Sequence, residues 1–355
     1  MRIAIDARAV QPKLQGMGRH VLNLLLGFSC LESDLEFLVI YSNPLARKLV
    51  ERSGGAFRSR FQWIKSVSMP GNILEEVEIP WLLKVNKADL FHDVGTSGVW
   101  TAQVPVVTTI HELAALRFDE SPPVEWLKRL FKRSRLIVTV SQSLADEVEA
   151  NFNISRPKIR VITNAVDPWY AERVNEKEIE AMRERFRLRG KYFLCVTSEK
   201  TNKNIQLVFK AAAQWRESEQ WVFTISRKDE GNLRHLGVVE DVWLRPLYAA
   251  SEALIVPSLY EGFSLPPIEA LAIGSIPVVS DILPHREVLK DILPDSLFFD
   301  PTAVESLSRA LSAVSEGGEP LRRSVLEKFR LVSDRYSFKA RAEQVQAVYR
   351  EALRG

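Results

Sequence analysis

The chain has 355 residues, of which 46% are hydrophobic and 26% charged, a balance typical of globular proteins with two domains. Its net charge of +3 is too small an excess to indicate nucleic-acid binding. The two cysteines, Cys30 and Cys195, exclude a disulfide framework or cysteine zinc site, and the five histidines show no metal-ligand spacing. No apolar run approaches about 18 residues, so no membrane-spanning helix is expected. Residues 2–6 resemble a strand rather than a signal peptide, which predicts a cytoplasmic protein.

A glycine-rich turn follows the first predicted strand. Gly16 and Gly18 precede Arg19 and a run of apolar residues at helical spacing. Glycine lets the backbone approach a ligand closely, and Arg19 places a positive charge at the start of the helix. The G-x-G-x-x-G fingerprint of dinucleotide-binding proteins is absent, and a purely structural turn explains this stretch about as well.

A histidine ends a later strand. Residues 104–110 are rich in β-branched side chains and predict a buried strand, and His111 follows at its carboxyl end. Parallel sheets bind ligands at that end, although polar residues in such loops are more often structural. Further strands are predicted at 37–41, 136–141 and 159–167, with Ser143 as a candidate N-cap of the helix after the second of these.

Residues 122–135 combine aromatic and basic side chains. At helical spacing Trp126 and Phe131 share one side with two leucines, and cations flank that side. Residues 1–168 contain 21 Lys and Arg against 18 Asp and Glu, so the whole positive excess lies in this half. The segment could therefore lie on an anionic membrane surface, although an ordinary surface helix packed by its apolar stripe is the favoured interpretation.

The second half begins after a boundary expected at 168–178. A helix over 178–187 leads to a strand at 192–197, a polar loop at 198–204 and a helix at 205–215. The loop contains Lys203, and a lysine at the start of a helix can neutralise a diphosphate, although a solvated lysine is an equally good explanation.

Two carboxylates distinguish the loop after the strand predicted at 253–256. Glu261 and Glu269 flank a turn that leads into a helix beginning near Pro267, and another strand follows at 276–280. The amides of 262–265 approach a helix N-terminus, which attracts phosphate, whereas the carboxylates suit sugar and ribose hydroxyls. The alternative is a helix N-terminus with a glutamate that matches its dipole.

The stretch Glu-Gly-Phe-Ser-Leu-Pro-Pro-Ile-Glu at 261–269 resembles the E-x7-E motif of family 4 of the retaining glycosyltransferases, which have the GT-B fold. Similar stretches occur along the chain: G-x-G-R at 16–19, a His-Glu pair where the family has His-Asp, K-N at 203–204, and N-A-V-D at 164–167. Ser226 and Arg227 replace the family's glycine near the nucleotide base, so the base cannot be inferred.

The resemblance implies an α/β fold of two Rossmann-like domains with parallel sheets facing across a cleft. The acceptor-side domain would be 1–168, with a helix at 338–355 crossing back to it, and 169–337 would bind the nucleotide sugar. It implies transfer of a hexose, mannose-like by preference, from a nucleotide diphosphate sugar to a glycan or lipid-linked acceptor in cell-surface polysaccharide assembly. The location would be the cytoplasm or the inner face of the membrane. The alternatives are a catalytically weak regulator that binds nucleotide or glycan, and a phosphorylase-like enzyme, for which no lysine-held cofactor site is visible.

The resemblance also assigns residues. It implies catalytic roles for His111, Lys203 and Glu261. Neither a metal nor a cofactor is expected besides the sugar donor, because Lys203 and a second cation, with Lys200 as the candidate, would neutralise the diphosphate. The expected donor-binding residues are Gly16, Gly18, Arg19, Lys200, Gly262, Phe263, Ser264, Leu265 and Glu269.

Overall fold

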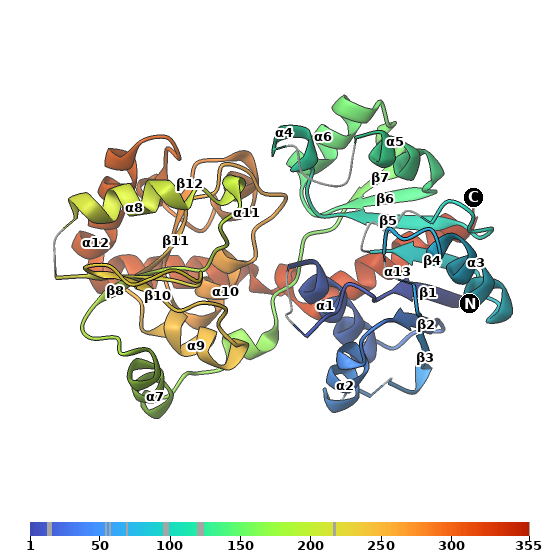
Figure 1. Ribbon diagram of the computed structural model, residues 1–355, viewed down its shortest axis with the longest axis horizontal. Coiled ribbons are helices and arrows are strands. Elements are labelled where there is room, and N and C mark those ends of the chain that lie inside the picture. Colours follow the sequence, from blue (N-terminus) through green and yellow to red (C-terminus); the bar gives the residue numbers. More distant parts are fainter. Residues whose placement is uncertain are drawn as a thin grey trace. The chain divides into compact units, whose positions relative to one another are not determined.

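The computed structural model describes residues 1–12, 16–53, 55–56, 58–68, 70–94, 99–118, 124–215 and 218–354. The chain forms two compact units, Met1–Ala165 with Arg335–Gly355, and Val166–Asp334. We call them unit 1 and unit 2. Each contains one parallel sheet with helices packed on it, which confirms the predicted α/β class with two Rossmann-like units (Figure 1).

Unit 1 is built on a seven-stranded parallel sheet in the order β3-β2-β1-β4-β5-β6-β7. The strands are β1 Arg2–Asp6, β2 Glu36–Tyr41, β3 Phe61–Lys65, β4 Leu90–Asp93, β5 Val106–Ile110, β6 Leu136–Thr139 and β7 Ile159–Val161. The helices are α1 Gly16–Cys30, α2 Leu45–Arg52, α3 Glu75–Val85, α4 Ala115–Phe118, α5 Val124–Arg133, α6 Gln142–Phe152 and α13 Phe338–Arg354.

Both faces of the central part of this sheet are buried, which is why its inner strands are mostly apolar. Alternate side chains of β1 enter opposite cores: Ile3 and Ile5 join the core under α1 and α13, and Ala4 joins the core under α3. The α13 helix, red in Figure 1, packs against α1, where a Cβ on Gly27 would lie 2.5 Å from the Phe338 carbonyl oxygen. The missing side chain at Gly27 therefore lets the C-terminal helix lie close to α1.

Unit 2 has a six-stranded parallel sheet in the order β10-β9-β8-β11-β12-β13. Its strands are β8 Tyr192–Cys195, β9 Gln220–Phe223, β10 Leu233–His235, β11 Ala253–Val256, β12 Pro277–Ser280 and β13 Phe298–Phe299. Its helices are α7 Glu176–Phe186, α8 Ile205–Gln214, α9 Asp241–Ala249, α10 Pro266–Ile273, α11 Leu283–Leu289 and α12 Val304–Val332.

Two helix starts differ from those predicted. The α6 helix is capped by Ser141, whose hydroxyl accepts a hydrogen bond from the Leu144 amide, and Ser143 lies inside the first turn. The α7 helix begins two residues before Glu178, because Asn175 and Glu178 form a reciprocal capping box. In both cases the residue predicted to begin the helix lies within its first turn.

The α5 helix does not present its aromatic side to solvent. Leu127, Leu130 and Phe131 are buried, and the half-buried Trp126 packs edge-on against Trp100. Residues 122 and 123 of the predicted membrane-contacting segment lie outside the described residues. The rest of the segment fits the favoured interpretation of a helix packed by its apolar stripe. Within the described ranges, no helix is both long and apolar enough to span a bilayer.

Candidate active site

The acidic loop of unit 2 connects the carboxyl end of β11 to the N-terminus of α10. Pro266 and Pro267 occupy the first turn of α10, and Gly274 ends that helix in the left-handed conformation. Ser264 also has a positive φ, +74°, which costs a non-glycine residue about 1 kcal/mol. Its hydroxyl is buried and finds no hydrogen-bond partner in the described part of the chain. Such strain is characteristic of ligand-binding turns.

Glu261 forms a close ion pair with Lys203. The Lys203 ammonium lies 2.7 Å and 2.9 Å from the two Glu261 carboxylate oxygens, and the Ser258 hydroxyl donates to the first of them at 2.6 Å. Burial alone would raise the pKa of Glu261, but Lys203 and Ser258 outweigh it and hold the pKa below its ordinary value of 4.5. The carboxylate is therefore ionised at neutral pH, and the pair carries no net charge.

Two asparagines fix the loop that carries Lys203. The 3-10 turn Thr201–Lys203 precedes α8, and the Asn204 amide donates to the carbonyl oxygens of Pro257 at 3.1 Å and Pro301 at 2.8 Å. Asn202 accepts at its backbone oxygen from the Leu259 amide, at 2.8 Å. The lysine loop and the acidic loop are thus joined by the backbone bond from Leu259 to Asn202 and by the bond from the Asn204 side-chain amide to the Pro257 carbonyl oxygen.

A buried histidine, His285, interacts electrostatically with Glu261. The His285 ring donates from Nδ1 to the Ser280 carbonyl oxygen at 2.9 Å, which leaves Nε2 as an acceptor without a described partner. Burial lowers the pKa of His285 despite the attraction of Glu261, so the ring is neutral. The Ser280 hydroxyl donates to the Ser258 backbone oxygen at 2.6 Å and so connects β12 to the acidic loop.

Glu269, in the first turn of α10, is buried and accepts a hydrogen bond from the Tyr248 hydroxyl of α9 at 3.0 Å. Gly262 and Phe263 are also buried, whereas Ser264 and Leu265 are half-buried and Lys200 is exposed at the start of the 3-10 turn. The predicted donor-binding residues of unit 2 thus lie on two adjoining loops and the helix start after them.

The two glycines of the glycine-rich turn in unit 1 have different surroundings. Gly16 is exposed at the first position of α1, and a Cβ there would meet nothing within 4 Å. Gly18 is buried, and a Cβ there would lie 2.7 Å from the Ala9 carbonyl oxygen. Gly18 is therefore needed for the close approach of α1 to the segment after β1, and the half-buried Arg19 follows it.

His111 belongs to a polar cluster at the end of β5. Its Nε2 lies 3.3 Å from the Val94 carbonyl oxygen, which can only accept, so Nε2 carries the proton. The His111 ring packs edge-on against the His20 ring, with centroids 3.9 Å apart. Burial and then the charge of Arg341 lower the pKa of His111 to about 3, so that it is neutral near pH 7.

Arg341 reaches this cluster from the C-terminal helix α13. Its Nη2 donates to His20 Nε2, and His20 Nδ1 donates to Asn164 Oδ1 at 2.6 Å. The Nε and Nη1 groups of Arg341 have no partner among the described residues, and burial lowers the pKa of this guanidinium to about 9. A second buried histidine, His92, bonds the Tyr349 hydroxyl of α13 at 2.6 Å.

Sequence reasoning missed the partners of the residues it selected. Ser258 and Tyr248 lie close to the motif in sequence. Because a buried carboxylate needs hydrogen-bond donors, these nearby hydroxyls could have been predicted as partners of the two glutamates. No pattern connects His20 to Arg341, which is 321 positions away, or indicates that Lys203 contacts Glu261.

Comparison with known families agrees with this architecture. Residues 14–170 match Glycosyltransferase Family 4, and residues 176–330 match Glycosyl transferases group 1. The chain belongs to the family 4 and group 1 glycosyltransferases. This membership confirms the family that the E-x7-E motif and the other similar stretches predicted.

Two relatives and one solved structure place the chain within these glycosyltransferases. It is 29% identical over 204 residues to the O-antigen chain mannosyltransferase RfbU of Salmonella typhimurium, a match spanning 54% of each chain and so about half the length of that relative. It is 26% identical over 301 residues to the MMP alpha-(1->4)-mannosyltransferase of Mycolicibacterium hassiacum, covering 75% of this chain and 71% of that one. The structure of Anabaena Alr3699/HepE in complex with UDP and glucose aligns with a TM-score of 0.78 at 13% identity, covering 99% and 100% of the two chains. The last comparison supports the GT-B fold.

Proposed function

We propose that the protein is a hexosyltransferase that moves a mannose-like sugar from a nucleotide diphosphate sugar to a glycan or lipid-linked acceptor in cell-surface polysaccharide assembly. The observation that carries the proposal is the Lys203–Glu261 ion pair beside the strained Ser264 turn, at the carboxyl end of β11. Mannosyltransferases among the relatives favour a mannose donor. Mannose transfer and the acceptor class rest on relatives that the chain matches over half to three quarters of their length.

The Lys203–Glu261 pair offers a cation to the diphosphate of a sugar nucleotide and a carboxylate to the hydroxyls of its sugar. Lys203 would turn from Glu261 to the diphosphate, where it stabilises the charge that develops on the leaving β-phosphate. Glu261 would accept hydrogen bonds from sugar hydroxyls, and Glu269 from the ribose. The amides of Gly262 to Leu265 at the start of α10 would bind phosphate, with exposed Lys200 as a second cation.

Transfer would retain the configuration of the sugar, as in the retaining family that the sequence resembles. The bond from the anomeric carbon to the phosphate oxygen breaks with its electron pair on the phosphate. The acceptor oxygen then bonds to the anomeric carbon on the same face, and its proton passes to the leaving phosphate. Lys203 and Lys200 take the place of a metal in this scheme. His111 is assigned to the donor sugar, and Gly16, Gly18 and Arg19 to the phosphate side.

Incubation with a panel of nucleotide sugars, GDP-mannose and UDP-glucose among them, tests the proposal. We expect release of free nucleoside diphosphate with one donor, accelerated by a glycan or polyprenyl-diphosphate-linked acceptor, and an α-linked product from an α-linked donor. Binding of nucleotide without turnover for any donor would instead favour a catalytically weak regulator. The departures at Glu112, Ser226 and Arg227 motivate that alternative.

A further inference from the structure

Unit 1 leaves a group of apolar side chains uncovered along α3. Twelve large apolar side chains are exposed in the described part of the chain, and six of these fall between residues 67 and 85. Their exposed fractions range from 55% at Val85 to 83% at Val67 and Ile73. We call this group the α3 surface; it consists of Val67, Ile73, Leu74, Val77, Trp81 and Val85. Single exposed apolar residues need no explanation, but a concentration of them marks an interaction site.

The spacing places four of these residues on one side of α3. Val77, Trp81 and Val85 are four positions apart and share one side of α3, with Leu74 three positions before them. The opposite side of α3 already packs on the sheet through buried Ile79, Leu82 and Leu83. A helix on a sheet needs only one apolar face, so the outer face is not explained by folding.

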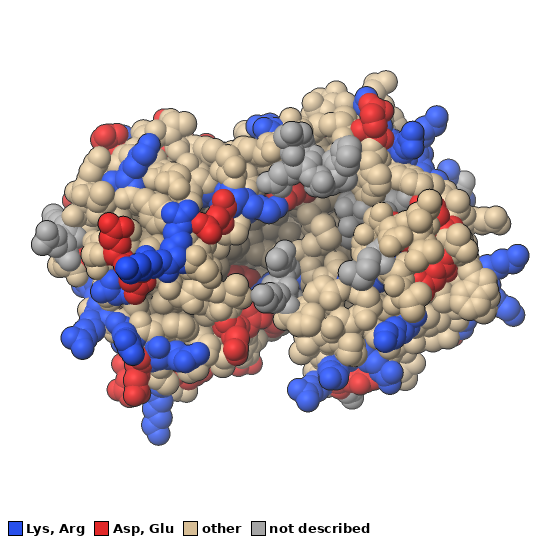
Figure 2. All heavy atoms as spheres, in the orientation of Figure 1, with Lys and Arg blue, Asp and Glu red and all other residues tan. Residues whose placement is uncertain are grey.

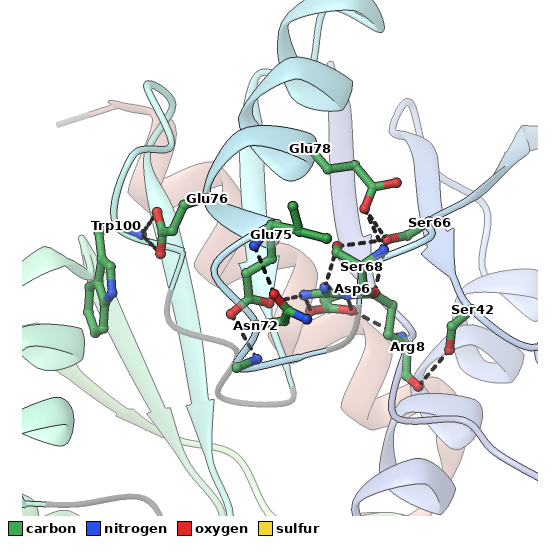
Figure 3. A network of polar contacts seen from close by, with 12 residues as sticks. Asp6, Arg8, Ser42, Ser66, Ser68, Asn72, Glu75, Glu76, Glu78 and Trp100 are labelled. Carbon is green, nitrogen blue, oxygen red and sulfur yellow. Dashed lines mark hydrogen bonds and ion pairs between the residues drawn. The ribbon is translucent and has the colours of Figure 1, made fainter.

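The carboxylates of α3 are hydrogen-bonded to neighbouring loops rather than free on this surface (Figure 3). Glu75 is buried, with Oε2 2.9 Å from the Arg8 guanidinium and Oε1 accepting from the Gly71 amide. Glu76 accepts from the backbone amides of Trp100 and Thr101.

Glu78 is engaged in the same way and also connects Val67 to the helix. Its carboxylate accepts from the amides of Val67 and Ser68 at 2.8 Å and 2.7 Å, and from the Ser66 hydroxyl. Burial would raise the pKa of Glu78, but these bonds outweigh it and lower the pKa.

Lysines accompany the apolar residues. Lys65, Lys84 and Lys87 are exposed beside the α3 surface, and Asp89, the exposed carboxylate just beyond them, accepts from the Arg2 backbone amide. In the face drawn in Figure 2, the region around α3 is mostly tan, with some acidic side chains within it and basic side chains at its outer edge. Two copies joined through this face would bring lysines against lysines, whereas an anionic surface complements them.

We propose that the α3 surface binds the interface of an anionic lipid bilayer. Tryptophan and short apolar side chains at the level of the headgroups, with lysines beside lipid phosphates, are the chemistry of peripheral membrane binding. The contact is thereby assigned to α3, not to residues 122–135. The inference goes beyond the proposed transfer reaction and does not depend on which sugar is moved, since its test measures binding.

Vesicle co-sedimentation of the full chain tests the inference, with phosphatidylglycerol–phosphatidylcholine vesicles compared with phosphatidylcholine alone. We expect binding to the acidic vesicles that weakens with salt. Replacing Val77, Trp81 and Val85 with serine should lower the partition coefficient at least about tenfold. The matched control replaces three apolar residues of similar exposure in unit 2 with serine and should bind as the native protein does; these are Val238, Val242 and Leu331.

Variants that remove charge test whether α3 or α5 binds the membrane. Lys84→Gln with Lys87→Gln should weaken binding severalfold and flatten its salt dependence, whereas Lys128→Gln with Lys132→Gln on α5 should change little. Thermal unfolding checks that each variant is folded.

Three outcomes would overturn the inference. The native protein could stay in the supernatant with acidic vesicles at low salt, or the α3 and control variants could lose binding equally. Sedimentation velocity could also show a dimer that the α3 variant abolishes, which would make a second copy the occupant.

Discussion

Each unit holds a cation beside the carboxyl ends of its strands, and the two cations have opposite surroundings. Lys203 of unit 2 is largely covered and lies within 2.9 Å of both oxygens of a carboxylate. The Arg341 side chain of unit 1 is buried, and the hydrogen bonds described for its guanidinium go only to the neutral His20 ring. Burial lowers the pKa of Arg341 to about 9, whereas the pair with Lys203 lowers the pKa of Glu261.

The difference indicates what each cation can do. Lys203 keeps a counter-charge when it exchanges Glu261 for a ligand phosphate, and sugar hydroxyls bound to Glu261 would offset the carboxylate's loss of its cation. An unpaired buried guanidinium costs folding free energy, and its bond to His20 serves to position the ring that packs on His111. The following changes break or sharpen this contrast.

The largest effect is expected from Glu261→Gln. The amide keeps the shape of the side chain but loses the charge that pairs with Lys203 and accepts sugar hydroxyls. We expect turnover to fall about a hundredfold, on the order of 3 kcal/mol in the barrier, with the fold retained. Steady-state nucleotide release measures the loss, with Glu180→Gln on the exposed side of α7 as the control. Native turnover in the Glu261 variant would remove this residue from the donor site.

Lys203→Met should show how much the ion pair with Glu261 contributes to the stability of the fold. It leaves the Glu261 carboxylate buried without its cation, so we expect the unfolding free energy at pH 7 to fall by about 2 kcal/mol, less than for a fully buried pair because Lys203 is partly exposed.

The pH dependence of that loss has a definite sign. In the native protein the pKa of Glu261 lies below 4.5, so its stabilisation is present above pH 4.5 and disappears as the pH falls through the lower folded pKa. Without Lys203, burial raises the pKa of Glu261 in the variant, so the deficit of Lys203→Met should shrink as the pH falls through that raised pKa and the carboxyl protonates. Urea unfolding from pH 3.5 to 8 measures it, and a pH-independent deficit would mean that lost packing, not charge, explains the variant.

Arg341→Met should have a smaller effect on stability, because it removes a cation that has no counter-charge among the described residues. We expect the unfolding free energy to change by less than about 1 kcal/mol and the pKa of His111 to rise from about 3. Because the folded pKa of His111 is depressed, the native protein loses stability as the pH falls from 6.5 toward 3, and the variant should lose less. Histidine NMR titration tests this, with Arg354→Met at the exposed end of α13 as the control.

Removal of metal should have no effect on transfer. If Lys203 and Lys200 neutralise the diphosphate, excess EDTA leaves nucleotide release unchanged, and a metal-dependent transferase assayed in parallel confirms that chelation is complete. Activity that disappears with EDTA and returns with manganese would contradict the assignment of the two lysines.

The sequence predicted the architecture because its strands are continuous apolar runs and the E-x7-E motif belongs to one family. It misplaced two helix starts, since Ser141 and Ser143 are both suitable caps and only the backbone decides between them. It also treated α5 as the membrane candidate, because periodicity shows that a helix has an apolar side but not whether that side faces the core.

The site was predicted in part. Glu261 and Lys203 were both selected, but with separate ligands, because nothing in a sequence brings together residues 58 positions apart. The cluster around His111 could not be predicted for the same reason: Arg341 lies in the last helix, far from the histidines in sequence. The α3 surface was missed because apolar residues occur on both sides of that helix and hide the pattern.

The most direct test of the account is the charge reversal Lys203→Glu with Glu261→Lys, assayed for both stability and nucleotide release. An ion pair remains possible, so we predict an unfolding free energy closer to the native value than that of Lys203→Met. The cation then stands where the sugar hydroxyls should bind and the carboxylate where the diphosphate should, so transfer is lost. A stable reversed variant that still releases nucleotide at the native rate would contradict the claim that this pair holds the donor.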